Sequence, residues 1–132
     1  DLVWLKTDLS ANGTPCLLFS HIPLDNTAED PPPPKGDDWY FPSFYHAQGE
    51  GIREMIEDSS RVLICMAGHR HRNNHREING IHYITHQSLT HRNKATGHPY
   101  GAFSIVEIDH GEIRINGYGV KQESRSLKIS IP

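Results

Sequence analysis

The chain has 132 residues, enough for one domain with its own hydrophobic core. Its formal net charge is −3, with 13 basic and 16 acidic residues, so the composition gives no electrostatic support for binding a nucleic-acid polymer. No apolar run is long enough to span a bilayer and no signal peptide is visible at the start, so we expect no membrane association. Histidine is the unusual residue, because ten are present and histidine is the commonest metal ligand.

The first segment is predicted to be an amphipathic helix. Leu2, Leu5 and Leu9 recur at helical spacing, and the pair at 12–13, Asn-Gly, is a good helix stop. A helix already under way at the first residue suggests a piece of a longer protein. The alternative is a helix that begins at Asp1, which can act as its N-cap.

Two apolar runs are predicted to be buried strands, and each ends on histidine. The run at 15–20 leads into His21 and a proline, and the run at 62–67 leads into Gly68, His69 and His71. A lone histidine in such a place is usually a turn or cap residue. The repeated arrangement favours a metal site, because buried strands hold the residues at their carboxyl ends on a rigid platform.

The two cysteines lie inside these same strands. Cys16 and Cys65 are each surrounded by apolar residues, where a thiol behaves as a small hydrophobe. We therefore expect free thiols in a reducing compartment, and hence a cytoplasmic protein.

Residues 25–51 are predicted to form a loop insertion that is rich in proline and aromatic residues. Four prolines occupy 31–34, and five aromatic residues fall within 39–45, among them Trp39 and Tyr45. One interpretation is a lid whose aromatic rings stack on a substrate ring; the other is a loop that packs its rings against the domain to hold itself in place.

The remaining elements complete an α/β (α+β) pattern. An amphipathic helix over 50–58 joins the two buried strands, which predicts a right-handed βαβ unit with parallel strands. An Asn-Gly turn at 79–80 predicts a hairpin over 77–85. A further strand candidate follows at 100–108, and alternating segments follow at 112–120 and 127–131, so we expect the C-terminal half to be an antiparallel meander.

The two histidine blocks together resemble a known family. A strand ending in Ser-His-Ile-Pro-Leu, followed by a strand ending in Gly-His-Arg-His, is similar to the last two signature blocks of the calcineurin-like metallophosphoesterases. The chain most resembles the branch of cyclic-nucleotide phosphodiesterases and ADP-ribose/CDP-alcohol pyrophosphatases. The resemblance covers most of the chain outside the insertion. It implies an αββα sandwich, with residues 1–132 as the C-terminal part of a single domain and a mixed sheet ending in an antiparallel meander.

The resemblance also implies metal-ligand roles. His21 and His69 correspond to the histidines that bind the second metal of the family, and His71 corresponds to the histidine that reaches the first metal. Two divalent ions lower the pKa of a bridging water, orient the phosphate and neutralise the charge that develops on its oxygens. Neutral imidazoles suit several metals, with Mn, Fe or Zn expected here, so residue type does not choose among them.

The family's earlier signature blocks, Asp-x-His, Gly-Asp and Gly-Asn-His-Asp/Glu, are expected before the first helix and are not in this sequence. The partial look-alikes at 36–38, 73–75 and 109–110 stand in the wrong order. We therefore expect no catalytic residue within this chain, partial or no metal occupancy, and little activity from residues 1–132 alone. The expected partner is the missing N-terminal half or a second copy of the chain.

Three function classes remain open from sequence. The first is a metallophosphoesterase acting on a small phosphoester such as a nucleotide or a phosphodiester, with Trp39, Tyr45, Asn73 and His91 as candidate substrate-binding residues. The second is a non-catalytic module that uses the same histidines for metal binding or self-association. The third is an interaction domain in which the histidines are incidental. For the other histidines, ordinary polar roles are the default: His46, His75, His82, His86, His98 and His110.

Overall fold

The computed structural model of the chain describes residues 2–11, 13–25 and 49–129. The insertion expected at 25–51, with Trp39 and Tyr45, lies outside the described residues except at its two ends. Neither described helix has the length and apolar character needed to cross a membrane. The described elements are, in chain order, α1 (Leu2–Ala11), β1 (Cys16–Ser20), α2 (Gly49–Ser59), β2 (Val62–Ala67), β3 (Asn74–Ile78), β4 (Ile81–Thr85), β5 (Phe103–Asp109), β6 (Glu112–Tyr118) and β7 (Arg125–Lys128).

The first sheet is mixed and has the strand order β1-β2-β4-β3. Strands β1, β2 and β4 are parallel, and β3 is antiparallel to β4 at one edge. The predicted β1-α2-β2 unit is present. The predicted hairpin is present as β3–β4, with Asn79 at φ 52° and Gly80 at φ 79°, the left-handed values that a two-residue hairpin turn requires.

The position of this hairpin differs from the expectation of one continuous C-terminal meander. Every residue of β4 is buried, and β4 pairs in parallel with β2 in the middle of the first sheet. A strand buried on both faces gains more from a central position than from a meander. Only β5, β6 and β7 form the antiparallel meander, and they make a second sheet.

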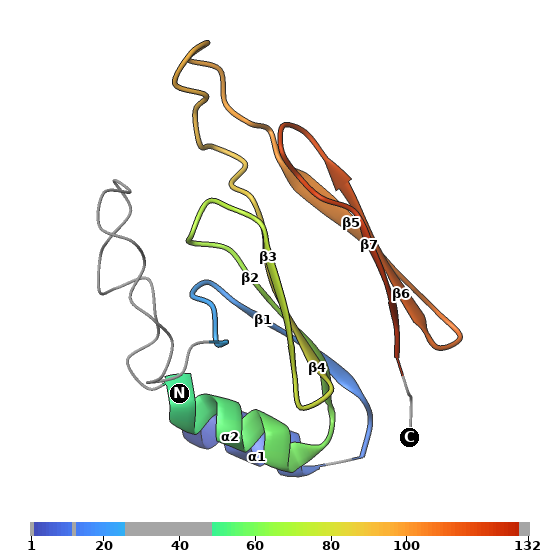
Figure 1. Cartoon of the computed structure of the whole chain (residues 1–132). Coiled ribbons are helices and arrows are strands. Elements are labelled where there is room, and N and C mark those ends of the chain that lie inside the picture. Colours follow the sequence, from blue (N-terminus) through green and yellow to red (C-terminus); the bar gives the residue numbers. More distant parts are fainter. Residues whose placement is uncertain (1, 12, 26–48, 130–132) are drawn as a thin grey trace.

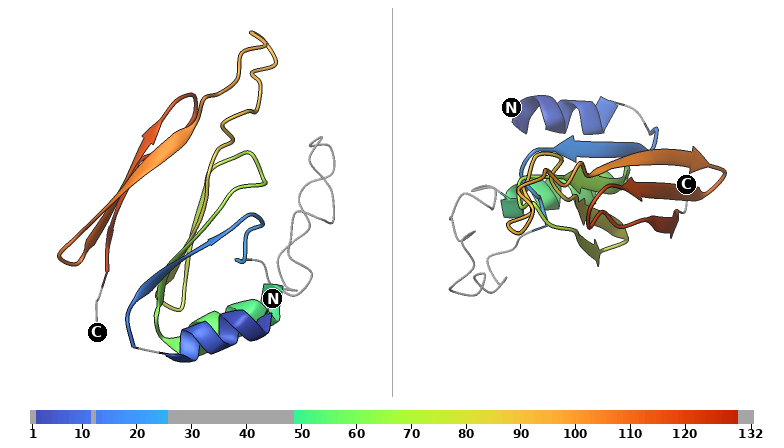
Figure 2. Two further views of the ribbon diagram at one scale, coloured as in Figure 1. Left: turned by 180° about the vertical axis from the view of Figure 1, so that it is seen from behind. Right: turned by 90° about the horizontal axis from the view of Figure 1, so that it is seen from above.

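The hydrophobic core has two parts, one on each face of the first sheet. Residues of α1 and α2, such as Leu9, Ile52 and Ile56, pack with Cys65 and Tyr83 on one face. On the other face, the second sheet packs against the first. Buried residues from both sheets fill the interface between them: Ile64, Met66, Ile84, Ile113, Ile115 and Leu127. Figures 1 and 2 show the resulting layers of helices, first sheet and second sheet. The fold class is therefore mixed α and β with two sheets, as expected.

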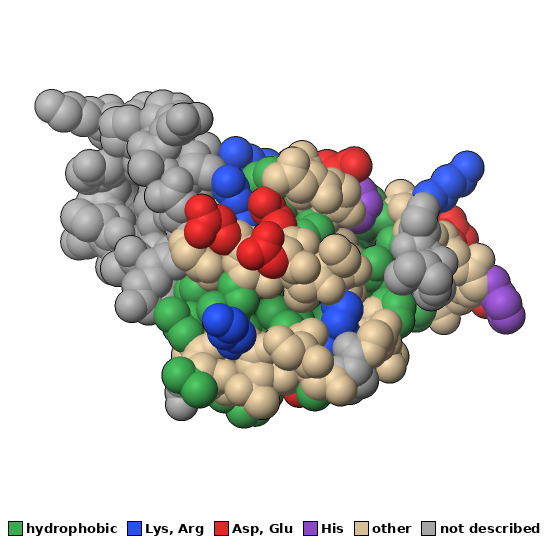
Figure 3. Space-filling view, turned by 90° about the horizontal axis from the view of Figure 1, so that it is seen from below, with side chains coloured by type: hydrophobic (Ala, Val, Ile, Leu, Met, Phe, Trp, Pro, Cys, Tyr) green, Lys and Arg blue, Asp and Glu red, His purple; other side chains and the backbone are tan. Residues whose placement is uncertain are grey.

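The two helices lie side by side against the sheet. Arg61 binds the carbonyl oxygens at the C-terminal end of α1. The Arg61 guanidinium donates hydrogen bonds to the carbonyl oxygens of Asp8, Leu9 and Thr14, at 2.7 to 2.9 Å. A cation that binds the last carbonyls satisfies acceptors that the helix itself leaves open. Seen from below, hydrophobic side chains fill the space between the helices, and acidic side chains lie beside them (Figure 3). Glu54 and Asp58 of α2 are exposed there.

The open edges of the two sheets lie on the same side of the molecule. Strand β1 is an edge of the first sheet and β5 is an edge of the second. The view from above in Figure 2 shows both edges on the side of α1, opposite β3 and β7. Large apolar side chains are exposed there, with Phe19 at 67%, Phe103 at 52% and Ile105 at 49%. An exposed apolar patch beside unpaired strands favours association with another chain segment.

We expect residues 1–132 alone to self-associate through this open edge. The double substitution Phe19→Lys and Ile105→Lys should shift the chain toward monomer, because charges on an edge oppose strand pairing and both side chains are largely exposed. Size-exclusion chromatography with light scattering measures this. The control is Ser126→Lys on β7, an exposed position at the opposite edge of the second sheet. A monomeric parent, or an equal effect of the control, would contradict the expectation.

The two cysteines should differ in reactivity. Both are free, and Cys65 is only 3% exposed. Burial raises the pKa of the Cys65 thiol to about 12, so almost no thiolate forms near neutral pH. Burial also raises the pKa of Cys16, which is only partly buried. We expect a disulfide reagent to label Cys16 first and to reach Cys65 only on unfolding. Mass spectrometry of native and denatured samples measures the order, and Cys16→Ser identifies the site. Equal native rates would contradict it.

Candidate metal centre

The two histidine blocks meet because their strands run in parallel. Cα atoms of Ser20 and Ala67 are partners at the ends of β1 and β2, so the segments that follow leave from the same rim of the sheet. The Gly68 amide donates a hydrogen bond to the His21 carbonyl at 3.2 Å, which ties the two segments together. The backbone therefore places both histidine segments at the same rim of the sheet, as the sequence predicted.

His21 and His69 form a close pair. His21 Nε2 and His69 Nδ1 are 2.9 Å apart, and the rings meet edge to face with their centroids separated by 4.7 Å. Without an ion, one ring nitrogen donates its proton to the lone pair of the other. Two imidazoles on one tetrahedral zinc, each about 2.0–2.1 Å from the ion, have their nitrogens about 3.3 Å apart. The two nitrogens are therefore nearly as close together as two ligands of one ion.

His71 lies beside the pair and faces a different neighbour. Its ring centroid is 5.2 Å from that of His91. The pKa of His71 is lowered chiefly by burial, and further by the nearby charges of His91, His69 and His21. A lowered pKa keeps the imidazole neutral, which is the form that binds a metal. The two-plus-one division of the histidines is the one that the resemblance implies; their binding of metal stays a prediction.

The backbone of this turn is strained. His69 has φ 64° and His71 has φ 51°, both in the left-handed region that non-glycine residues rarely adopt. Each such conformation costs on the order of 1–3 kcal/mol and persists only where surrounding contacts enforce it. The turn that carries two candidate ligands is therefore held by tertiary contacts.

A row of side chains leads from His71 along the rim. The His91 ring contacts the Tyr100 ring at 5.1 Å, and Lys121 Nζ lies 5.6 Å from the Tyr100 centroid. The Asn73 side chain donates a hydrogen bond to the Lys121 carbonyl. The predicted candidates Asn73 and His91 thus lie on the rim with His71, while Tyr100 and Lys121 join it from distant parts of the chain. No signal in the sequence connected those two to the histidines.

Asp25 is a further residue that the sequence did not indicate. It stands at the start of a polar run, yet it is 2% exposed and lies among Arg70, Asn74 and Arg76. The one feature of the sequence that could have indicated a buried acidic partner was Arg70, the arginine between His69 and His71. Trp39 and Tyr45, the other substrate-binding candidates, lie outside the described residues.

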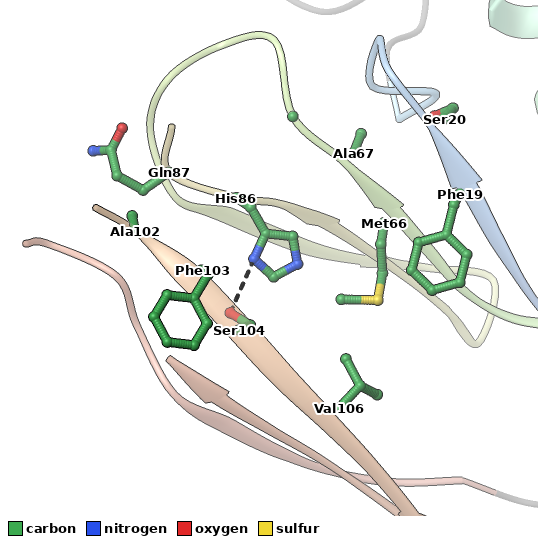
Figure 4. Close-up of a pocket in the computed structure, with 11 residues that line it drawn as sticks. Phe19, Ser20, Met66, Ala67, His86, Gln87, Ala102, Phe103, Ser104 and Val106 are labelled. Carbon is green, nitrogen blue, oxygen red and sulfur yellow. Dashed lines mark hydrogen bonds between the residues drawn. The ribbon is translucent and has the colours of Figure 1, made fainter. Parts of the chain in front are cut away.

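A cavity of about 330 Å³ opens between the sheets beside the centre, and Figure 4 shows its lining. Phe19 of β1 and Phe103 of β5 stand at its sides, and the His86 ring lies between the two sheets. His86 Nδ1 is within hydrogen-bond distance of the Ser104 hydroxyl, at 3.4 Å, and accepts from the Gln122 amide at 2.9 Å. The cavity is lined by residues of β1, β2 and β5 and of the segments beside them. Neither His21 nor His69 is among its lining residues.

The other described histidines stay outside the centre. His75 Nε2 and His82 Nδ1 are 3.1 Å apart on the β3–β4 hairpin, and His110 is fully exposed in the turn after β5. His98 is exposed in the loop before β5, and His46 lies outside the described residues.

The donor set fits part of a dinuclear centre. In the part of the chain that the structure describes, no three His, Cys, Asp or Glu side chains are arranged to hold a metal ion. The close pair fits two positions of one ion, and His71 supplies a separate neutral nitrogen.

Comparison with solved structures identifies the fold. The chain is similar to a dimetal phosphatase from Danio rerio, with a TM-score of 0.73 and 19% identity over 98% of this chain. The match covers 37% of that phosphatase, so the chain spans little more than a third of its length. The architecture is therefore that of a metallophosphoesterase-like fold, and the likeness at this identity concerns the fold alone.

A mutant of Vps29 from Entamoeba histolytica aligns with a TM-score of 0.41 and 19% identity, over 64% of this chain and 48% of that one. This score is too low to support an argument. No family model matches the sequence, and no curated protein matches it.

His69→Ala should weaken binding of Mn²⁺ or Zn²⁺ to the protein by at least about tenfold, or about 1.4 kcal/mol, because it removes half of the close pair. Isothermal titration calorimetry measures the dissociation constant. His110→Ala is the matched control, since that side chain is fully exposed and away from the rim. Equal affinities of the two variants would count against the centre.

Proposed function

We propose that this chain is part of a metal-dependent phosphoesterase, in which it supplies His21, His69 and His71 to a dinuclear metal site. One observation carries the proposal: two imidazole nitrogens converge to 2.9 Å at the ends of adjacent parallel strands. The coarser support is the fold, which is shared with a dimetal phosphatase. The particular branch, that of nucleotide phosphodiesterases and pyrophosphatases, is inferred from the Ser-His-Ile-Pro block.

The residues of this chain would bind and orient two divalent ions, with Mn, Fe or Zn expected. Such ions supply Lewis-acid stabilisation of phosphate oxygens and a hydroxide nucleophile at neutral pH. His21 and His69 would share one ion because their nitrogens converge, and His71 would serve the other because its ring contacts the His91 ring instead of joining the close pair. No residue of this chain is assigned a catalytic proton transfer.

The substrate is proposed to be a small phosphoester that extends along the rim. His91, Tyr100 and Lys121 form a row of two rings and a positive charge. The ring centroids of His91 and Tyr100 are 5.1 Å apart, and Lys121 Nζ lies 5.6 Å from the Tyr100 centroid. A nucleotide-type substrate carries the complementary groups, a ring that stacks and a further phosphate that pairs with an ammonium group. This row adds Tyr100 and Lys121 to Asn73 and His91 as substrate-binding candidates.

The partner is proposed to be the complementary N-terminal half of the sandwich, docked along β1 and β5. Two observations support it. The match to the phosphatase covers almost all of this chain but 37% of that protein, and the open edges expose Phe19, Phe103 and Ile105 together. A strand that pairs in parallel with β1 would end at the rim where His21 lies, which is where further ligands are needed. The two free cysteines are compatible with a cytoplasmic location.

Hydrolysis of bis-p-nitrophenyl phosphate with Mn²⁺ tests the function. Residues 1–132 alone should give little or no turnover, because the signature blocks that carry the carboxylate ligands of the resembled family are not in this sequence. The protein with its complementary half should give turnover that His69→Ala abolishes and His110→Ala leaves unchanged. Robust, His69-dependent turnover by residues 1–132 alone would contradict the division of the site between two halves.

The alternative is a non-catalytic module that binds metal or self-associates through the same surfaces. It is favoured by the incomplete ligand set among the described residues and by the apolar open edge. A protein that binds Mn²⁺ through His69 but shows no turnover, with its complementary half present, would establish this alternative.

A further inference from the structure

We propose that Asp25 is a positioning residue for the metal centre: its carboxylate, paired with Arg70, holds the turn that presents His69 and His71 and fixes the end of the segment that carries His21. The proposal rests on the proposed function in so far as the histidines bind metal. It goes beyond that function because it assigns a role to a buried ion pair that contacts none of the reacting groups.

Asp25 is held from several sides. Its Oδ1 lies 3.7 Å from Arg70 Nη2, and its Oδ2 lies 3.7 Å from Arg76 Nη1 and accepts a hydrogen bond from Asn74 Nδ2 at 3.3 Å. Arg76 Nη1 also donates to the Asp25 carbonyl oxygen at 2.9 Å. With 2% of its surface exposed, the carboxylate is a buried charge, and such a charge is tolerated only when it is paired.

Arg70 connects this carboxylate to the candidate ligands. It is the residue between His69 and His71, and its side chain is 8% exposed and directed to Asp25. The two histidines on either side of it have left-handed backbones. A strained turn needs contacts that enforce it, and the buried ion pair acts at its central residue. With Arg70 turned toward Asp25, the neighbouring imidazoles are left to face the rim.

Asp25 also belongs to the segment that carries His21. Between them, Pro23 and Leu24 are buried, so both ends of this short segment are fixed. The Gly68 amide bonds to the His21 carbonyl at the same place. The ion pair therefore links the two segments on which the 2.9 Å contact between His21 and His69 depends.

There is also an electrostatic consequence. Without the Asp25 carboxylate, the positive charges of Arg70 and Arg76 would lose a negative partner close to the proposed cation site. At short range in a poorly solvated region such charges disfavour a second cation. Loss of Asp25 should therefore weaken metal binding through both orientation and charge.

The test is titration of the protein with Mn²⁺ alone, followed by calorimetry, for the parent, Asp25→Asn, Arg70→Gln and the double variant. Asp25→Asn keeps the shape of the side chain and should raise the dissociation constant about 10- to 100-fold, the range for residues that orient metal ligands. The double variant should bind Mn²⁺ no more weakly than the weaker-binding of the two single variants, because both substitutions remove the same contact between Asp25 and Arg70.

A matched control separates positioning from a general loss of stability. Arg53→Gln removes the ion pair with Glu57 on α2, in which Arg53 Nε and Glu57 Oε1 are 3.1 Å apart, away from the rim. Urea unfolding without metal measures the stability of each variant. Asp25→Asn should weaken Mn²⁺ binding while Arg53→Gln does not. Should Asp25→Asn fail to fold, Arg70→Lys serves instead, since it keeps the charge but changes the shape of the side chain that packs against Asp25, and it should bind Mn²⁺ more weakly than the parent.

A second readout does not require metal. In ¹⁵N spectra of the histidine rings, Asp25→Asn should shift the signals of His21, His69 and His71 and leave those of His110 unchanged. Parent-like Mn²⁺ affinity together with unchanged ring signals would overturn the role of Asp25. If the parent binds no Mn²⁺ through His69 even with its complementary half present, the proposed function fails, and the ring signals alone decide whether Asp25 positions the histidines.

Discussion

The parallel pairing of β1 with β2 is the constraint on which the rest of the structure depends. Because both strands run in one direction, their carboxyl ends lie at the same rim, and the histidines that follow them meet. An antiparallel pairing would place His21 and His69 at opposite ends of the sheet. The crossover through α2 makes the parallel pairing possible, and burial of β2 between the helices and the second sheet makes it rigid. Packing of the core therefore sets the geometry of the site.

A rigid strand is not sufficient to orient the side chains beyond its end. The turn after β2 places His69 and His71 in left-handed backbone conformations, which local preferences oppose. The ion pair of Asp25 with Arg70 is buried there, whereas a pair such as Arg114 with Glu112 is largely open to solvent. Exposed pairs contribute little to stability, but a buried pair is costly to break from one side. This difference explains why the buried pair can restrain a strained turn.

Two kinds of incompleteness occur together in this structure. Among the described residues, no complete metal-binding group is present, and the strand that leads to His21 is an edge of its sheet. One added strand beside β1 would address both, since it would cover Phe19 and end at the histidine rim. On the second sheet, β5 is likewise an edge strand, and it exposes Phe103 and Ile105. A single complementary segment is a simpler physical explanation than separate causes for the open edge and the partial site.

Much of the local structure could be predicted from the sequence. Apolar runs predicted β1 and β2, Asn79 and Gly80 predicted the hairpin turn, and clean alternation predicted β6, because each signal lies within a few neighbouring residues. The family resemblance carried by the two histidine blocks implied the metallophosphoesterase-like architecture that the comparison supports.

Tertiary structure decided what depends on residues far apart in the chain. It placed β4 beside β2 instead of in the meander, buried Asp25 against Arg70, and set Tyr100 and Lys121 in line with His91. None of these contacts has a local pattern, since a polar run looks the same whether its first carboxylate meets water or two arginines. The sequence by itself therefore determined the elements and the candidate ligands, and only the packing of distant segments decided which side chains meet and what holds them there.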